Sequence, residues 1–328
     1  LPGYLEFLQE AGVDALIIAD IGVLELAKRY APRLARHVST QLGVINSAAA
    51  NALYALGADT VVLARETPRA DIRKIRANTP RELRLEAFVH GAMCVSFSGR
   101  CLLSNYLTGR DANRGQCAQP CRWKYHLVEE KRPGEYFEIS EDGGTHIMNS
   151  RDLRMIEHIG ELMDAGISSF KIEGRMKSAY YAAVVTNAYR HAIDAAEKGL
   201  PLDAVWVEET EKVSHRPYST GFYYGEPGQY YADASYFSEA DVAAVVVSCD
   251  AEGNALLTQR NKFRRGDALE LLPADGKPIA FTAGRIDDAE GNEIEDTRHA
   301  MMELRMKLPV FAPENSIVRK CRQSAAFA

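Results

Sequence analysis

Short apolar runs rich in β-branched residues alternate with segments of helical periodicity over the first 199 residues of the chain. The runs predict β-strands, and most of the segments between them predict amphipathic helices. The predicted strands cover residues 15–19, 36–40, 60–64, 83–89, 146–149 and 168–172. Because strands that alternate with helices form parallel sheets, this part of the chain is predicted to be an α/β domain.

Two of the helices are marked by their ends. Ser150 can cap a helix in which apolar residues recur every three or four positions from Leu153 to Met163. Another helix is predicted over residues 177–198, where Gly199 provides the stop. A closed (β/α)8 barrel needs eight strands, and six are predicted. We therefore expect a TIM-like (β/α) barrel that lacks its first two βα units, in preference to an open doubly wound sheet.

The pattern changes after residue 200. Residues 1–200 are assigned to the partial barrel, 201–228 to a connecting segment and 229–328 to a small all-β barrel domain. Turn signals rich in Gly, Asn and Asp separate the short strands of this last domain. These strands are predicted over residues 242–249, 255–259, 268–272, 278–283, 302–306 and 316–320.

The composition is that of an ordinary globular protein. Of the 328 residues 46% are hydrophobic and 26% are charged, which excludes a disordered, collagen-like or small disulfide-rich chain. No run approaches the roughly 18 apolar residues of a membrane span, and no secretory signal is recognisable. We expect a soluble, cytoplasmic protein with no membrane partner.

The charge is unevenly distributed. The net charge of −6 argues against polyanion binding by the molecule as a whole. Residues 91–125 differ, because they carry five basic side chains against one acidic side chain, a local net charge of +4. This segment is a long insertion after a predicted strand, where α/β proteins place their active sites. It contains four of the six cysteines, Cys94, Cys101, Cys117 and Cys121.

These four cysteines have the spacing C-x6-C-x15-C-x3-C. Four thiolates can bind either a structural zinc ion or an iron–sulfur cluster. The spacing favours a cluster slightly, because only the last pair approaches the tight knuckle that is typical of structural zinc sites. Disulfide bonds and buried free thiols are the two other interpretations.

Four motifs carry a resemblance to a known family. They are residues 86–104 (EAFVHGAMCVSFSGRCLLS), 105–125 (NYLTGRDANRGQCAQPCRWKY), 169–178 (SFKIEGRMKS) and 215–221 (HRPYSTG). In these motifs the chain resembles peptidase family U32, the collagenase-like group, and within it the subgroup that hydroxylates tRNA. That subgroup requires prephenate, and its product is 5-hydroxyuridine at the wobble position of the anticodon.

The resemblance implies a TIM-like barrel, a C-terminal β-barrel of translation-factor type and a 4Fe-4S cluster on the four loop cysteines. The chain departs from it at the N-terminus, where family members have two further βα units. Three hypotheses follow: a prephenate-dependent tRNA hydroxylase, a family U32 peptidase, and a cluster-bearing subunit that needs a paralogous partner. The residues support a peptidase poorly, because neither an H-E-x-x-H nor a G-x-S-x-G motif is present and metal-bound thiolates cannot attack a carbonyl.

Charged side chains near two strand ends are the candidate catalytic groups. Lys171 and Glu173 share one face of their strand, and Arg175 follows. Lys171 and Arg175 are expected to hold the carboxylates of prephenate while Glu173 orients or titrates one of them; a surface ion-pair cluster is the alternative. His90 is expected to act as a proton donor, and Glu86, on the same strand face, to pair with a lysine or arginine. The other strand-end residues expected at this mouth include Arg65 and Glu66.

Cations, amides and an aromatic ring surround the third and fourth cysteines. Such side chains can contact phosphates and stack on a flipped, unpaired base, which suits an anticodon loop better than a duplex. The candidate tRNA-binding residues are Arg110, Asn113, Arg114, Arg122 and Trp123. A second basic segment, residues 259–266, could contact the tRNA backbone. In both places the alternative is a solvated loop.

Overall fold

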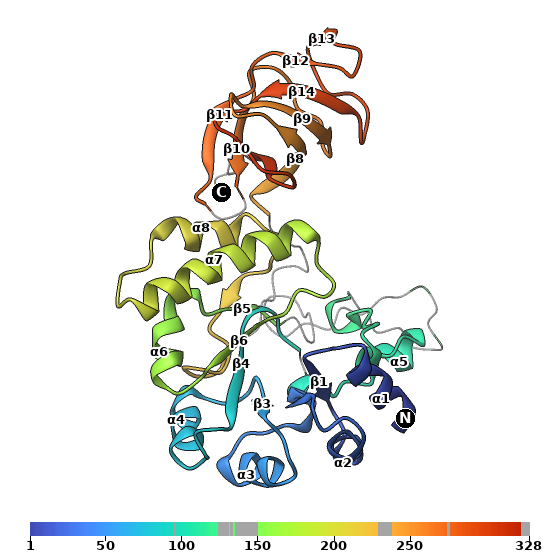
Figure 1. The fold of residues 1–328 in the computed structure, drawn as a ribbon, viewed down its shortest axis with the longest axis vertical. Helices are drawn as coiled ribbons and strands as arrows, with labels where there is room; N and C mark the ends of the chain where they lie inside the picture. Colours follow the sequence, from blue (N-terminus) through green and yellow to red (C-terminus); the bar gives the residue numbers. More distant parts are fainter. Residues whose placement is uncertain are drawn as a thin grey trace. The chain divides into compact units, whose positions relative to one another are not determined.

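The chain folds into two compact units in the computed structural model (Figure 1), which describes residues 1–94, 96–123, 131, 134, 150–228, 238–273 and 276–322. The first unit comprises Leu1–Met176 and His215–Tyr236, and the second comprises Lys177–Ser214 and Phe237–Ala328. The predicted strand at residues 146–149 lies outside the described residues. Among the helices that the structure describes, none has both the length and the hydropathy needed to cross a membrane.

The first unit is built on a mixed sheet in which strands β1 to β4 lie side by side in sequence order. Parallel pairing joins β1 to β2, β2 to β3, β3 to β4 and β4 to β6 (Figure 1). The long strand β4 also pairs in antiparallel fashion with β5, which in turn pairs with β7. The bounds are β1 Ala15–Ile18, β2 Ala35–Val38, β3 Thr60–Val62, β4 Arg84–Ala92, β5 Asp152–Arg154, β6 Ser169–Ile172 and β7 Tyr218–Ser219.

Side-chain caps and apolar faces explain the helices of this unit. Asp20 accepts a hydrogen bond from the backbone N–H of Val23 at the start of α2, and Asn46 caps α3 in the same way. The α-helices are α1 Pro2–Glu10, α2 Ile21–Tyr30, α3 Ser47–Ala55, α4 Arg69–Ala77, α5 Leu103–Thr108 and α6 Ile159–Asp164. The 3-10 helices are η1 Thr40–Leu42, η2 Phe97–Gly99, η3 Ala112–Arg114, η4 Pro120–Arg122 and η5 Ile156–His158.

The prediction of a helix that starts after Ser150 is wrong for its first residues. Residues Asp152–Arg154 form strand β5, and the α-helix begins only at Ile159. The Ser150 hydroxyl donates a hydrogen bond to the backbone oxygen of Met93 (2.9 Å) instead of capping a helix. Strand pairing with β4 satisfies the backbone of this segment, so the tertiary structure overrides the helical spacing of its apolar residues.

The second unit contains two helices and an antiparallel sheet. Helix α7, Ala179–Glu197, is capped by Ser178 and followed by the left-handed Gly199, which confirms the predicted helix to within two residues. Helix α8 spans Ala204–Glu211. The strands are β8 Ala240–Cys249, β9 Asn254–Gln259, β10 Ala268–Leu272, β11 Ile279–Thr282, β12 Ile286–Asp287, β13 Glu293–Ile294, β14 Glu303–Lys307 and β15 Ile317–Cys321.

The sheet order is β11-β10-β15-β8-β9-β14-β12-β13, and all of its pairs are antiparallel. Alternate side chains of these strands, including Leu257, Leu271 and Val318, form one buried core. All six strands predicted for this domain are confirmed; the two-residue strands β12 and β13 were missed. No pairing within the described residues joins β11 to β13, so the sheet has the form of a half-barrel.

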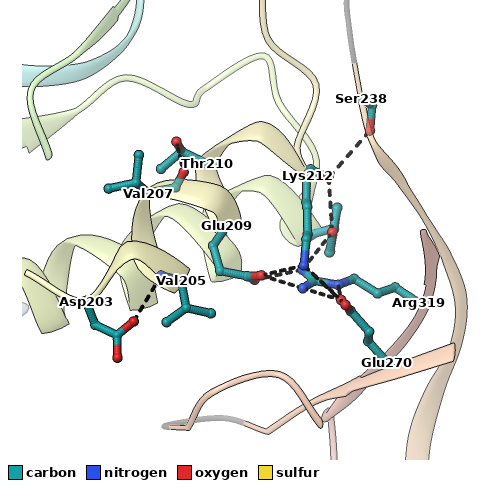
Figure 2. A network of polar contacts seen from close by, with 10 residues as sticks. Asp203, Val205, Val207, Glu209, Thr210, Lys212, Ser238, Glu270 and Arg319 are labelled. Carbon is teal, nitrogen blue, oxygen red and sulfur yellow. Dashed lines mark hydrogen bonds and ion pairs between the residues drawn. The ribbon is translucent and has the colours of Figure 1, made fainter. Parts of the chain in front are cut away.

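A buried ion-pair network joins the helices of the second unit to its sheet (Figure 2). The fully buried guanidinium of Arg319, on β15, donates two hydrogen bonds to Glu209 of α8 and one to Glu270 of β10. Lys212 donates to Glu270 as well. Tyr180 of α7 accepts a hydrogen bond from Arg319 (3.2 Å), and burial raises the pKa of this phenol to about 12. The network therefore connects α7, α8, β10 and β15.

Candidate functional site

Strands β4 and β6 bring the first group of predicted site residues together. Glu86 on β4 accepts hydrogen bonds from the Lys171 ammonium and the Ser169 hydroxyl on β6, both at 2.8 Å. Lys171 is thus the cation expected to pair with Glu86. Burial opposes ionisation of Glu86, but these hydrogen bonds and the Lys171 charge hold its pKa below the ordinary value. Glu86 is therefore charged and Lys171 has its own counter-ion.

Arg65 approaches the same strands from the loop after β3. Its guanidinium carbon lies 3.8 Å from the centre of the Phe88 ring on β4, in cation–π contact. Its Nη2 lies 3.7 Å from a carboxylate oxygen of Glu173, just after β6. Burial lowers the pKa of Arg65 from its usual value, and the Glu173 charge counteracts this. The Lys171 ammonium also lies over this ring, 5.6 Å from its centre, so two cations, each with its own carboxylate partner, contact Phe88. The sequence analysis missed Phe88, because it has the character of an ordinary core position.

Gly91 allows β4 and the end of β6 to lie this close. Its φ of +106° is in the region that favours glycine, and a Cβ there would lie 2.2 Å from the backbone oxygen of Glu173. The N–H of Glu173 donates to the backbone oxygen of His90 (2.9 Å). A side chain at Gly91 would therefore separate Glu173 from β4.

We expect Gly91→Ala to lower the free energy of unfolding by roughly 1–3 kcal/mol more than the matched Gly99→Ala. Gly99 is also left-handed (φ +78°), but a Cβ there meets nothing within 4 Å, so only the conformational cost applies. Urea unfolding of the two variants measures the difference. Equal stabilities would show that the close approach at Gly91 carries no energetic weight.

The start of the cysteine-rich insertion is anchored to the ends of β2 and β3. Glu66 accepts hydrogen bonds from the backbone N–H and the hydroxyl of Ser98, at 2.8 and 2.7 Å. The Phe97 ring packs on Gly43, where a Cβ would lie 2.9 Å from the ring. Arg100 donates to the backbone oxygen of Gln41. The insertion thus lies against the carboxyl ends of the parallel strands, where catalytic loops of α/β proteins are found.

Ser104 holds the middle of the insertion together. Its fully buried hydroxyl donates to the backbone oxygen of Arg110 (2.8 Å) and accepts from the backbone N–H of Ala118 (2.9 Å). One hydroxyl therefore connects α5 to the segment that carries Cys117. The sequence analysis did not single out Ser104, because a lone serine in a loop has no signal of its own.

Three of the four loop cysteines share a local geometry. The sulfur of Cys101 accepts a hydrogen bond from the backbone N–H of Leu103 (3.4 Å), and that of Cys117 accepts from Gln119 (3.3 Å). Cys94 has the equivalent bond from Ser96. In each case the donor lies two residues after the cysteine, so the backbone bends around the sulfur.

The electrostatics of Cys94 reflect the other thiols. Burial raises the pKa of the Cys94 thiol, the charges of Cys101 and Cys117 add to this, and the nearby Arg65 opposes it. None of the six cysteines is in a disulfide bond. Within the described residues, no three or more His, Cys, Asp or Glu side chains stand where they could hold one metal ion. The loop cysteines are therefore neighbours but are not gathered into a closed ligand set.

His90 is buried in an aromatic cluster. Its ring centre lies 5.4 Å from that of Tyr218, which stacks on His215 at 4.3 Å and lies under the Arg154 guanidinium. Tyr218 and His215 belong to the motif at residues 215–221. The motif therefore packs against the strand that leads into the first cysteine, and proton donation by His90 stays a prediction.

The same motif also supports the backbone beside Cys94. The buried Arg216 donates from Nη1 to the backbone oxygen of Ser150 (3.2 Å) and from its backbone N–H to Asp152 (3.3 Å). Since the Ser150 hydroxyl donates to Met93, the residue before Cys94 is held by this chain of contacts.

The candidate tRNA-binding residues are mostly on the surface. Arg110 is exposed, Arg114 pairs loosely with Asp111 (3.8 Å), and Trp123 is 44% exposed. Tyr106 on α5 is 85% exposed, and Leu102, just before α5, is exposed as well. Because α5 packs against η4, which ends one residue before Trp123, these two side chains extend the same surface. The side chains of Asn113 and Arg122 lie outside the described residues.

Arg175 and the basic segment 259–266 were both expected to bind anions, but the structure gives them other contacts. The Arg175 guanidinium lies against Gly115 of the insertion, where a Cβ would be 2.6 Å from Nη1. In the second unit, the basic segment 259–266 is matched by acidic partners, with Lys262 paired to Asp296 and Arg265 paired to Glu293, both at 2.8 Å. This charge pairing favours the solvated-loop interpretation of that segment.

Comparison with known protein families assigns the chain. The family described as "Peptidase family U32" matches residues 1–233, and the "Peptidase family U32 C-terminal domain" matches residues 238–319. The chain belongs to peptidase family U32. The resemblance found in the sequence motifs is thereby confirmed.

Individual relatives of the chain are named for different activities. "tRNA hydroxylation protein P1" of Bacillus subtilis (strain 168) is 36% identical over 327 residues, covering 98% of this chain and 77% of that protein. A 23S rRNA 5-hydroxycytidine synthase of Escherichia coli (strain K12) is 34% identical, covering 87% of this chain and 43% of its own length. "Collagenase" of Porphyromonas gingivalis (strain ATCC BAA-308 / W83) is 35% identical, covering 68% and 55%. The tRNA hydroxylation relative thus covers the chain most fully among these three.

Proposed function

We propose that this chain hydroxylates tRNA, converting the wobble uridine to 5-hydroxyuridine with prephenate as a required co-substrate and a 4Fe-4S cluster as cofactor. The observation that carries the proposal is the four-cysteine insertion anchored over the strand ends by Glu66 and Ser98. The likeness of the chain to a tRNA hydroxylation protein, which extends over 98% of its residues, supports the choice of substrate. In this proposal prephenate supplies the hydroxyl group: the C5–H bond of uracil becomes C5–OH and the C–OH bond of prephenate becomes C–H, so the two-electron oxidation of the base is balanced by the reduction of prephenate.

Cys94, Cys101, Cys117 and Cys121 would hold the cluster. Four thiols are the ligand set of a 4Fe-4S cluster, and hydrogen bonds from backbone N–H groups to the sulfurs are one way in which proteins tune such clusters. The N–H bonds at three of these cysteines fit that use. When bound, the cluster would supply redox-active iron next to Arg65 and the strand ends.

We also propose that the sheet of the first unit is part of a TIM-like barrel. Its parallel strands follow one another in sequence order, β1-β2-β3-β4-β6, whereas a doubly wound sheet reverses its order at a switch point. The insertion after β4 would then lie at the catalytic mouth of the barrel.

Exposed aromatic side chains beside the loop cations fit an unpaired RNA strand. Trp123→Ala should weaken binding of an anticodon stem-loop by about 5- to 150-fold, since stacking of one base on an aromatic ring contributes about 1–3 kcal/mol. Tyr106→Ala should weaken it within the same range. Tyr4→Ala, at a tyrosine on α1 that is 59% exposed, is the control. Fluorescence anisotropy with a labelled stem-loop measures the affinities. Unchanged binding by both loop variants would contradict the proposal that this surface binds RNA.

Expression of the chain in bacteria that lack their own tRNA hydroxylation genes tests the function directly. Nucleoside mass spectrometry of the purified tRNA should detect 5-hydroxyuridine only when the chain is expressed and prephenate synthesis is intact. A second candidate, peptide hydrolysis, is suggested by the similarity to a collagenase. Gelatin cleavage without any tRNA product would favour it. Product formed only after a paralogous protein is co-expressed would favour the subunit hypothesis.

A further inference from the structure

Arg65 is an unusual cation for its surroundings. Only 10% of its side chain is exposed, and within the described residues its nearest carboxylate oxygen, on Glu173, lies 3.7 Å away, beyond hydrogen-bond distance. The guanidinium has five N–H donors, and none of its nitrogens is among the fully buried atoms that lack a partner, so these donors reach the solvent of the site. Burial of the rest of the side chain lowers the pKa of Arg65 from its usual value.

The groups around Arg65 already have partners of their own. Both carboxylate oxygens of Glu66 accept bonds from Ser98, and the Tyr223 hydroxyl donates to the backbone oxygen of Phe88 (2.6 Å). The aromatic face of Phe88 supports the guanidinium but cannot accept its in-plane hydrogen bonds. The donors of Arg65 are therefore held in place by stacking and stay available to an added acceptor.

The other two candidate anion-binding cations are less suitable. Lys171 has a short ion pair with Glu86 (2.8 Å), and Arg175 is packed against Gly115. The partner of Arg65, Glu173, is about one-third exposed and lies at a long distance. Its other carboxylate oxygen accepts a hydrogen bond from the backbone N–H of Arg175 (3.1 Å), and this bond can persist when another anion replaces the oxygen that faces Arg65. Glu86, by contrast, accepts hydrogen bonds from Lys171 and Ser169, both at 2.8 Å.

We infer that Arg65 binds a carboxylate of the small-molecule co-substrate, with Glu173 as the counter-ion that the carboxylate displaces. This inference rests on the proposed function, because it locates the co-substrate in that site. The planar guanidinium matches a carboxylate through two parallel N–H···O bonds, and the fixed stacking on Phe88 orients that pair. A small carboxylate fits this nine-tenths-buried position better than an RNA phosphate, which is flanked by two riboses. Arg65 is thus a specificity-determining residue for the co-substrate.

Isothermal titration of prephenate into the purified full chain tests the inference with three variants. Arg65→Gln should weaken binding about tenfold or more, because a charged hydrogen-bonded pair is lost. Arg65→Lys should give an intermediate loss, since the charge remains without the planar fork. Glu173→Gln should tighten binding, because the competing carboxylate is gone. Arg69→Gln, at an arginine paired with Glu161, is the matched control and should bind as the unmodified protein does.

Two results would overturn this inference and leave the proposed function standing. They are prephenate binding by Arg65→Gln with unchanged affinity, and weaker binding by Glu173→Gln. If Arg65→Gln also lost affinity for the anticodon stem-loop in parallel, an RNA phosphate rather than a carboxylate would be the ligand, and the inference would be wrong while the hydroxylase proposal stood. An unmodified protein that neither binds prephenate nor forms 5-hydroxyuridine with it would contradict the proposed function itself.

Discussion

Replacing Cys117 with alanine is expected to abolish 5-hydroxyuridine formation and to remove most of the iron and acid-labile sulfide from anaerobically purified protein. A methyl group cannot replace a thiolate ligand, and Cys117 lies in the segment that Ser104 fixes to the rest of the insertion. Iron, sulfide and zinc should be measured on the same samples, and nucleosides on tRNA from cells that carry only the variant.

Cys249→Ala is the control for this experiment. Cys249 ends β8 in the second unit and is also a free thiol, so its replacement tests whether loss of any cysteine has the same effect. It should keep its iron and its activity. Full modification of tRNA by Cys117→Ala would contradict the role of the cluster. Zinc in place of iron and sulfide would assign the four thiols to a structural metal site.

Arg319→Met should lower the free energy of unfolding of the second unit by about 3–5 kcal/mol. The variant leaves the buried Glu209 carboxylate without the guanidinium that donates two hydrogen bonds to it, and Glu270 loses a third (Figure 2). Lys212 stays 3.2 Å from Glu209, but a buried carboxylate that loses two hydrogen bonds together with a buried counter-ion is costly. Chemical denaturation followed by circular dichroism measures the change.

Arg322→Met is the matched control for Arg319→Met. Arg322 lies three residues further along the chain and pairs with Asp241, but both side chains are substantially exposed. Surface ion pairs of this kind contribute about 0–1 kcal/mol. If the two variants were equally stable, burial of the Arg319 network would not be what stabilises the contact between helices and sheet.

Much of the fold follows from local patterns in the sequence. Strand β10 lies at the predicted residues, and α7 begins after Ser178 and ends before Gly199, because its cap and stop residues act locally. The segment after Ser150 could not be predicted in this way. Its apolar spacing fits a helix, but β4 extends beyond β3 and offers backbone partners that only the assembled sheet provides.

The candidate site was predictable in part. Period-two alternation predicted that Glu86 and His90 share a face of their strand, and the ion pair of Glu86 with Lys171 was anticipated as a pairing with a lysine or arginine. The stacking of Arg65 on Phe88 could not be foreseen, because it joins the loop after β3 to strand β4 through a contact that no short motif encodes. The anchoring of the insertion by Glu66 and Ser104 depends in the same way on distant residues.

The central claim is that this chain forms 5-hydroxyuridine in tRNA in a prephenate-dependent reaction. The most direct test incubates the anaerobically purified chain with unmodified tRNA, with and without prephenate, and analyses the nucleosides by mass spectrometry. The account predicts that the wobble uridine gains one oxygen atom only in the presence of prephenate. Unmodified uridine under both conditions, from protein that contains its full complement of iron and sulfide, would contradict it.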